Sequence, residues 1–519
     1  MTDQTAPSIH WTRSRYGFAG FCCLFLVVVW FVLRVVLFFA FKPSGLSASD
    51  VVRAFLSGFH RDLFVAIVQT LPLLVWFLII PNHRFPARWH RLLILGATFT
   101  FCFVQIFLLF VEFFFFEEFK SRFNTVAVDY LIYPKEVFVN IWESYHVGIV
   151  IVVCFILAAG WLFAASKLFA RMWEQPISPR ARFAILIAAI AMTALAIPTL
   201  NFKHARISND RTLNELANNG AISFSAAAWT HNLDYTNFYK TLPLNEAYTR
   251  TRKLVAEPTT QFAEDGNSIR RRVVGDTNRP RLNLVILLEE SLGSEFWGCL
   301  SRKKTLTPEM DKLTAEEGML FTNLYANGNR TVRGMEGVLS SFPSLPGDSI
   351  VKRDRSDNVE TLARVLKRDG YSTLFAYGGR GFFDNMQPFA VRNGYDRFIE
   401  HNPPLHTDYH KPTFTTAWGV CDEDIFKRAI EELRALSQSG KPFFATVLSV
   451  SNHKPYTYPK GRIPEDPNKQ KRDYAVKYSD YCLGQFFKAA KKEAFWTNTI
   501  FAVIADHGAR VYGNQSIAT

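Results

Sequence analysis

The chain has 519 residues, of which 49% are hydrophobic, 15% are aromatic and only 20% are charged. This composition excludes a mainly disordered chain, and 28 Gly, 24 Pro and 7 Cys exclude a collagen-like or disulfide-stapled fold. The net charge is +13, but residues 1–202 carry +6 of it and no basic tail follows. The charge therefore does not indicate a nucleic-acid partner and fits basic loops at a membrane surface better.

Five apolar stretches in the first 202 residues are long enough to cross a bilayer, which takes about 20 residues per helix. They cover residues 18–41, 64–80, 92–116, 147–165 and 184–200. Arg34, inside the first stretch, requires a polar partner or a tilt toward the membrane interface. The first stretch is too long for a removable signal peptide and lacks a small-residue cleavage site. The sequence predicts a transmembrane domain of five helices over residues 1–202.

Basic residues mark alternate loops between these stretches. The loops before the first stretch, between the second and third, and between the fourth and fifth are rich in Arg and Lys: Arg13, Arg15, Arg84, Arg88, Arg91, Lys167, Arg171, Arg180 and Arg182. The other loops mix both signs of charge. By the positive-inside rule the N-terminus is cytoplasmic, and five crossings place everything after residue 202 outside the cytoplasm.

Three cysteines, Cys299, Cys421 and Cys482, fall in this exported part. Three cysteines could form one disulfide and leave one free thiol, or they could form no disulfide at all; their number does not decide between the two.

The pattern of the chain changes twice after the transmembrane domain. Residues 203–280 are polar and weakly periodic, which predicts a juxtamembrane helical linker. From residue 281, buried strands alternate with helices, which predicts an α/β domain with a parallel sheet. The expected strands are 282–288, 372–377, 442–450 and 499–505, and the expected helices are 332–339, 359–369, 423–437 and 474–491. Ligands of such sheets bind beyond the carboxyl ends of the strands.

Polar side chains stand at three such places. Glu290 follows the strand 282–288, Asp506 and His507 follow the last strand, and Thr331 opens an apolar helix. Taken separately, each has an ordinary structural explanation. Glu290 could pair with an arginine, Asp506-His507 is a common turn dipeptide, and Thr331 could be a helix cap. Together, Glu290, Asp506 and His507 offer oxygen and nitrogen ligands for one divalent cation. That cation would also contact Thr331 and lower the pKa of its hydroxyl, at a helix N-terminus suited to a phosphate.

With these motifs the chain resembles the lipoteichoic acid synthase family, the membrane phosphoglycerol transferases of the alkaline phosphatase and sulfatase superfamily. The matching segments are Leu-Glu-Glu290-Ser, Asn-Arg-Thr331, Tyr-Gly-Gly-Arg380 through Asn385, Trp418-Gly-Val-Cys-Asp, Ser-Asn-His453-Lys-Pro-Tyr and Ala-Asp506-His507-Gly. The resemblance implies a sulfatase-like α/β catalytic domain over residues 281–519, outside the membrane. The Phe-Trp-Asn-Arg run of the Gram-positive synthases is absent, which favours a Gram-negative host.

The chain stops twelve residues after His507, where the family continues with further sheet and helix. We therefore expect a domain that is incomplete at its C-terminus, as a fragment or as a truncated form.

The resemblance also implies roles for single residues. Thr331 is expected to be the nucleophile and a metal contact, with Glu290, Asp506 and His507 as the other metal ligands. The residues expected on the substrate side are His453, Arg380, Asn385 and Trp418. The expected cation is Mn²⁺ or Mg²⁺, with Zn²⁺ as the alternative.

The implied reaction transfers phosphoglycerol from phosphatidylglycerol to an extracytoplasmic glycan or glycerophosphate polymer, through a phospho-threonine intermediate. The implied location is the bacterial inner membrane, with a periplasmic or extracellular catalytic domain. The acceptor, the oligomeric state and the metal stay open.

Three other functions stay open. A phosphoethanolamine transferase shares this plan, but usually carries several disulfides, and three exported cysteines argue against it. A sulfatase that hydrolyses sulfuric esters needs Cys or Ser in a C/S-x-P-x-R segment, which Thr331-Val-Arg-Gly does not match. A non-catalytic membrane sensor is the alternative outside enzymes, and the presence of all four core motifs argues against it.

Overall fold

The computed structural model describes two compact units. The described residues are 11–508 apart from 44, 133, 201–206, 209, 231–240, 265, 274–279, 301–305, 346–347, 354 and 404. The first unit runs to residue 231 without residues 135–144, and the second contains residues 135–144 and 232–510. The segment in which the C-terminal truncation is expected, residues 509–519, lies outside the described residues.

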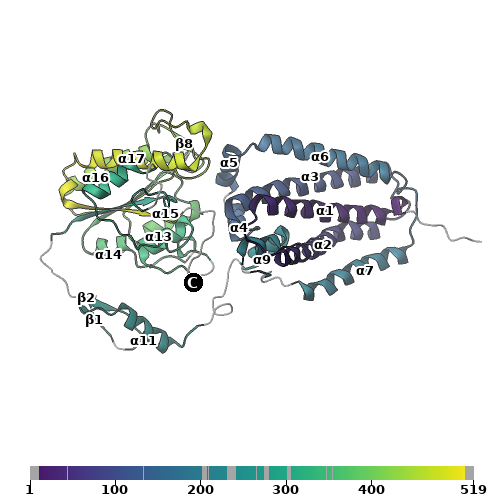
Figure 1. Cartoon of the computed structure of the whole chain (residues 1–519), viewed down its shortest axis with the longest axis horizontal. Helices are drawn as coiled ribbons and strands as arrows, with labels where there is room; N and C mark the ends of the chain where they lie inside the picture. Colours follow the sequence, from purple (N-terminus) through teal and green to yellow (C-terminus); the bar gives the residue numbers. More distant parts are fainter. Residues whose placement is uncertain are drawn as a thin grey trace, which may run out of the picture. The chain divides into compact units, whose positions relative to one another are not determined.

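The first unit is a helix bundle, whose members lie alongside one another in Figure 1. Its long helices are α1 (Arg15–Phe41), α2 (Ala48–Ile79), α3 (Arg88–Phe119), α6 (Val147–Leu168) and α7 (Pro179–Ala196). These are the five helices in the described chain that are long and apolar enough to cross a membrane. The predicted five-helix transmembrane bundle is therefore confirmed.

Arg34 has a partner inside this bundle. Its guanidinium donates to both carboxylate oxygens of Asp62 in α2, at 2.7 Å each, and both side chains are buried. The Nδ2 of Asn219 donates to the same carboxylate at 2.9 Å. Of the two explanations that the sequence left open, the structure supplies the polar partner.

The chain after the fifth helix returns to the bundle. The short helices α8 (Arg211–Leu216) and α9 (Gly220–Thr230) contact α1 and α2, and Leu213 and Leu216 are fully buried among their apolar side chains. The first part of the stretch predicted as a linker therefore packs on the bundle.

Several shorter helices and strands lie outside the five long helices and outside the larger sheet described next. They are α4 (Thr125–Ile132), α5 (Pro134–Ser144), α11 (Leu244–Val255), β1 (Thr260–Phe262), β2 (Arg271–Val273), β6 (His401–Asn402), β7 (His406–Thr407), β8 (Thr415–Thr416) and β9 (Gly419–Val420).

The second unit is built on a five-stranded parallel sheet. The strand order is β11 (Thr499–Ala505), β3 (Asn283–Glu289), β10 (Phe443–Leu448), β4 (Ser372–Tyr377) and β5 (Arg397–Ile399). The four predicted strands are confirmed. The edge strand β5 was not predicted because three residues are too few to show a strand period.

Helices cover both faces of this sheet. They are α12 (Pro308–Glu316), α13 (Thr331–Ser340), α14 (Leu362–Arg368), α15 (Met386–Arg392), α16 (Asp422–Gln438) and α17 (Arg472–Ala490). In Figure 1, α16 and α17 lie on one face, and α13 and α14 lie on the other. Strands β10 and β4 are accordingly almost wholly buried, as expected for parallel strands between two helical layers. The predicted α/β domain is therefore confirmed.

Candidate functional site

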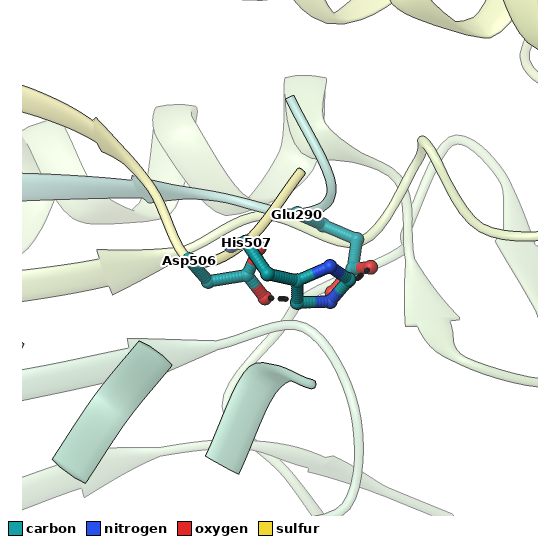
Figure 2. A group of neighbouring side chains, drawn as sticks. All are labelled: Glu290, Asp506 and His507. Carbon is teal, nitrogen blue, oxygen red and sulfur yellow. Dashed lines mark hydrogen bonds and ion pairs between the residues drawn. The ribbon is translucent and has the colours of Figure 1, made fainter. Parts of the chain in front are cut away.

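Strand register brings the predicted metal ligands together. Ala505 of β11 pairs with Glu289 of β3, so the residues that follow, Asp506 and Glu290, leave the sheet side by side. Glu290, Asp506 and His507 each offer a ligand atom, and these atoms lie within 4.8 Å of one another. Figure 2 shows the two carboxylates and the imidazole turned toward a common point. Glu290 and Asp506 are 2% and 1% exposed, so this small volume is shielded from solvent.

The charges in this cluster are unbalanced. Burial and the neighbouring Glu290 carboxylate raise the pKa of Asp506 well above its usual value. Burial also acts to raise the pKa of Glu290, but His453, His507 and Ser291 outweigh it and hold that pKa well below its usual value. Two adjacent buried carboxyl groups therefore do not both ionise without a further positive charge.

A divalent cation fits this cluster. Asp506 Oδ2 is buried without a hydrogen-bond partner, although buried carboxylate oxygens are normally paired. The His507 Nε2 lies 3.6 Å from both Glu290 Oε1 and Asp506 Oδ2. Two carboxylates and an imidazole suit Mn²⁺, Mg²⁺ or Zn²⁺, so the donor set agrees with the predicted cation.

Thr331 lies at the edge of this cluster. Its hydroxyl donates to Glu290 Oε2 at 2.9 Å, from the first residue of α13. Gly334, one turn later, allows this approach, because a Cβ at that position would lie 2.3 Å from the Asp506 carbonyl oxygen. Helix α13 therefore rests directly on the Asp506 turn, with the Thr331 hydroxyl at its N-terminus, the positive end of the helix dipole.

His453 and Trp418 form a second side of the site. The His453 Nε2 lies 3.3 Å from the same Glu290 Oε2 that accepts from Thr331. The Trp418 ring stacks on the His453 ring with centroids 4.1 Å apart, and its indole N–H donates to the Lys454 carbonyl at 2.8 Å. The structure thus joins Glu290, Thr331, Asp506, His507, His453 and Trp418 through direct contacts.

The other two predicted substrate residues make different contacts. Arg380 donates to the Pro403 carbonyl at 3.2 Å, and Asn385 donates to the Val351 carbonyl at 2.8 Å from a left-handed backbone conformation. Their role in substrate binding stays a prediction.

Three small polar residues that were given no role support Glu290 directly. Ser291, in a left-handed conformation, donates its hydroxyl to Glu290 Oε1 at 2.5 Å and its N–H to Asp506 Oδ1 at 2.8 Å. Ser449 Oγ accepts from the Glu290 N–H at 2.9 Å, and Asn452 Nδ2 donates to the Glu290 carbonyl at 3.1 Å. The signal for them in the sequence is their position, one to four residues beyond the ends of β3 and β10.

Asp422 fastens the loop that carries His453. It is fully buried at the start of α16, and its Oδ1 accepts from the N–H groups of Val450 and Ser451, at 2.8 and 3.0 Å. Its Oδ2 accepts from the Ser479 hydroxyl of α17 at 3.0 Å. The carboxylate at a helix N-terminus thus ties α16, α17 and the loop after β10 together.

We expect Asp422→Ala to destabilise the second unit by about 2–4 kcal/mol, because it leaves two buried N–H groups unsatisfied. Asp422→Asn should lose less, since its amide oxygen still accepts from both groups. The measurement is chemical denaturation of the full chain, with hydrogen exchange at Val450 and Ser451. Asp473→Ala, an exposed acid in the first turn of α17, is the control. Unchanged exchange at both amides in Asp422→Ala would contradict this role.

The family model described as Sulfatase matches residues 282–518. These residues form a sulfatase-family domain. The predicted membership of the alkaline phosphatase and sulfatase superfamily is thereby confirmed for the matched residues.

Other similarities extend this result. The chain is 26% identical over 244 aligned residues to phosphoglycerol transferase I of Salmonella paratyphi B, an alignment covering 44% of this chain and 31% of that protein. The chain therefore spans about a third of the length of the curated relatives that it matches.

Two solved structures are also similar. A protein of the alkaline phosphatase superfamily from Vibrio parahaemolyticus is 48% identical over 46% of this chain and 57% of its own, with a TM-score of 0.43. The integral membrane lipooligosaccharide phosphoethanolamine transferase A of Neisseria meningitidis is 13% identical, with a TM-score of 0.55 over 96% of this chain and 83% of its own. The latter shares the fold of a membrane bundle followed by a C-terminal domain.

Proposed function

We propose that this chain is a membrane-bound phosphoglycerol transferase. It would move phosphoglycerol from phosphatidylglycerol to a hydroxyl of an extracytoplasmic glycan or glycerophosphate polymer. The observation that carries the proposal is the meeting of the Thr331 hydroxyl and the His453 imidazole at one carboxylate oxygen of Glu290, beside buried Asp506 and His507. The similarity of the chain to phosphoglycerol transferase I supports the choice of transferred group.

In this proposal Glu290, Asp506 and His507 would hold the divalent cation, and the Thr331 hydroxyl would also contact it. Bound there, the cation supplies positive charge that lowers the pKa of that hydroxyl and offsets the charge of the phosphodiester. Mn²⁺ and Mg²⁺ suit the two carboxylates, and Zn²⁺ suits the imidazole.

The first step forms a bond between Thr331 Oγ1 and the phosphorus of the lipid and breaks the bond between phosphorus and the diacylglycerol oxygen. The proton of the hydroxyl passes to His453, whose Nε2 lies 3.3 Å from the same Glu290 oxygen that the hydroxyl contacts. His453 then gives that proton to the departing diacylglycerol oxygen. Diacylglycerol leaves, and phosphoglycerol remains as an ester on Thr331.

The second step reverses these roles. The acceptor hydroxyl attacks the phosphorus and gives its proton to His453, and the bond between phosphorus and Thr331 Oγ1 breaks. Thr331 Oγ1 takes that proton from His453, which restores both side chains. Trp418 fixes the plane of the His453 ring through stacking and would border the glycerol moiety. Arg380 and Asn385 remain candidates for contacts to the acceptor.

A phosphoethanolamine transferase is the second candidate. The observation that favours it is the fold similarity to phosphoethanolamine transferase A over nearly the whole chain. The cysteines argue against it, because all seven, Cys299, Cys421 and Cys482 among them, are free thiols in the structure. The transferred group decides between the two, and the adduct experiment in the Discussion measures it.

The proposed location is the inner membrane, with the sulfatase-family domain on the extracytoplasmic side. Phosphatase fusions after residue 210 should therefore be active, and fusions near residue 88 should be inactive, because alternate loops differ in basic charge. A fusion near residue 45, between α1 and α2, serves as a positive control. Activity at residue 88 without activity at residue 210 would overturn the orientation, and the donor lipid would then lie in the opposite leaflet.

A further inference from the structure

One end of the bundle gathers basic residues, and we call it the basic end. It comprises the start of α1, the turn from α2 to α3, and the turn from α6 to α7, residues 11–20, 80–95 and 165–186. These described segments carry nine Arg and Lys side chains against a single acid, Glu174, which is exposed.

Two of the arginines are buried and share one neutral acceptor. Arg15 of α1 and Arg182 of α7 are 1% and 4% exposed. Arg15 Nη2 donates to Asn82 Oδ1 at 3.0 Å, and Arg182 Nη2 donates to the same oxygen. Arg182 also donates to the carbonyls of Ile80 and Ile177, at 2.6 and 3.0 Å. Each of its nitrogens therefore has an acceptor, but none of these acceptors carries a charge.

Arg15 is less well satisfied than Arg182. Its Nε and Nη1 are buried without a hydrogen-bond partner, and its guanidinium lies 3.6 Å from the centre of the Phe85 ring. Among the described residues, neither Arg15 nor Arg182 has a carboxylate within ion-pair distance. A buried charge without a counter-charge costs several kcal/mol, so an arrangement with two of them side by side requires an anion.

The backbone favours an anion at the same place. Helices α1, α3 and α7 begin at Arg15, Arg88 and Pro179, so three helix N-termini converge on the basic end. Each adds partial positive charge. A basic pocket between membrane helices is a recognised site for anionic headgroups.

We propose that the basic end binds the phosphate of an anionic phospholipid headgroup through Arg15 and Arg182. The guanidinium groups of Arg15 and Arg182 lie close together around the Asn82 side-chain oxygen. Such a pair can donate to both unesterified oxygens of a phosphodiester, because guanidinium groups bind phosphate through paired hydrogen bonds. A lipid without net charge, such as phosphatidylcholine, satisfies the pair less well, because its ammonium group balances the phosphate. Phosphatidylserine also has an ammonium group, but its carboxylate keeps the headgroup negatively charged. In the proposed orientation this lipid belongs to the cytoplasmic leaflet, and the site is independent of the reaction at Thr331.

The test uses the purified full chain in micelles of a zwitterionic detergent, with phosphatidylserine as the probe because it is not the proposed donor. We expect phosphatidylserine to raise the thermal unfolding midpoint, while phosphatidylcholine leaves it unchanged. Arg15→Gln should weaken phosphatidylserine binding at least tenfold in native mass spectrometry. Arg84→Gln, which removes an exposed charge at the same end, is the matched control and should bind like wild type.

A second variant keeps the test valid if Arg15→Gln fails to fold. Asn82→Asp places a negative charge of the chain itself between the two arginines. It should therefore raise the thermal unfolding midpoint without lipid, and phosphatidylserine should raise that midpoint no further. Asn124→Asp is the control. It places the same charge beyond the end of α3, where the side chain accepts from the Val126 N–H, and phosphatidylserine should still raise its unfolding midpoint.

Three results would overturn the proposal. The first is an Asn82→Asp protein that is less stable than wild type and is still stabilised by phosphatidylserine. The second is equal stabilisation of wild type by inorganic phosphate alone, which would assign the site to a free anion. The third is an Asp3→Asn protein that is less stable than wild type without lipid, which would assign the counter-charge to the chain.

Discussion

Thr331→Ala should abolish turnover of phosphatidylglycerol while leaving the bound metal in place. The substitution removes the proposed nucleophile but none of the ligands Glu290, Asp506 and His507, so we expect a loss of about 10⁴-fold or more in kcat. Thr331→Ser should keep measurable activity, because the hydroxyl survives and only the methyl group that restricts its rotamer is lost. The measurements are release of diacylglycerol and metal content per chain.

The same residue reports the transferred group. With the acceptor withheld, wild type should carry a phosphoglycerol ester on the tryptic peptide Thr331–Arg333 or its missed-cleavage neighbours, because only water can then release it. Thr331→Ala provides the blank for this mass measurement. An ethanolamine-phosphate adduct would assign the chain to the second candidate function. Absence of any adduct, with Thr331→Ala as active as wild type, would reject the enzymatic proposal.

Asp506→Asn should lose the metal and the activity while the domain stays folded. The asparagine oxygen still accepts from the N–H groups of Ser291 and His507, as Asp506 Oδ1 does now at 2.8 and 2.6 Å. The variant has no carboxylate to offer the cation opposite Glu290, and we expect at least tenfold weaker binding of Mn²⁺. Isothermal titration and metal analysis measure the affinity, and thermal unfolding of the metal-free protein checks the fold.

Asp480→Asn is the matched control for that variant. Asp480 is equally buried and also accepts from two backbone N–H groups, those of Glu309 and Met310, at 2.9 and 3.0 Å. It lies outside the ligand cluster, so its substitution should leave the metal affinity unchanged. Full metal occupancy in Asp506→Asn would remove this residue from the site.

The affinity for the metal should also fall as the pH falls. Because burial and Glu290 raise the pKa of Asp506 well above its usual value, its carboxyl group holds a proton that a cation must displace. Lower pH favours that proton and therefore opposes binding. Metal titrations at several pH values measure how steeply the affinity changes with pH. The change should be smaller in Asp506→Asn, since that variant has no carboxyl proton to release at this position.

The pattern of strands and ligands could be predicted because it is local. A continuous apolar run such as residues 284–288 specifies a strand buried on both faces, and the polar residue after it must lie at the sheet edge. The placement of Glu290 and Asp506 side by side followed from that rule and the parallel topology. The start of α13 at Thr331 followed from an apolar period that begins one residue later.

The parts that could not be predicted depend on contacts between distant segments. Asp422 holds the His453 loop through bonds to Val450 and Ser451, 28 and 29 residues away, and nothing in either segment alone specifies them. Likewise, the sequence shows that Arg34 needs a partner, but only packing selects Asp62.

The extent of α2 was also hidden from the sequence. This helix begins at Ala48, well before the predicted span at residue 64, because charged residues such as Asp62 lower the hydropathy without breaking a helix.

The Arg34–Asp62 pair also constrains how the bundle is made. An arginine near the middle of an isolated membrane helix opposes insertion by about 2.5–3.5 kcal/mol, and an aspartate does the same. Since the two charges sit in consecutive helices of opposite direction, we expect α1 and α2 to enter the bilayer together as a hairpin, with the charges already paired. Asn219, which reaches Asp62 only after the three further long helices α3, α6 and α7 have been made, would then close the pair last.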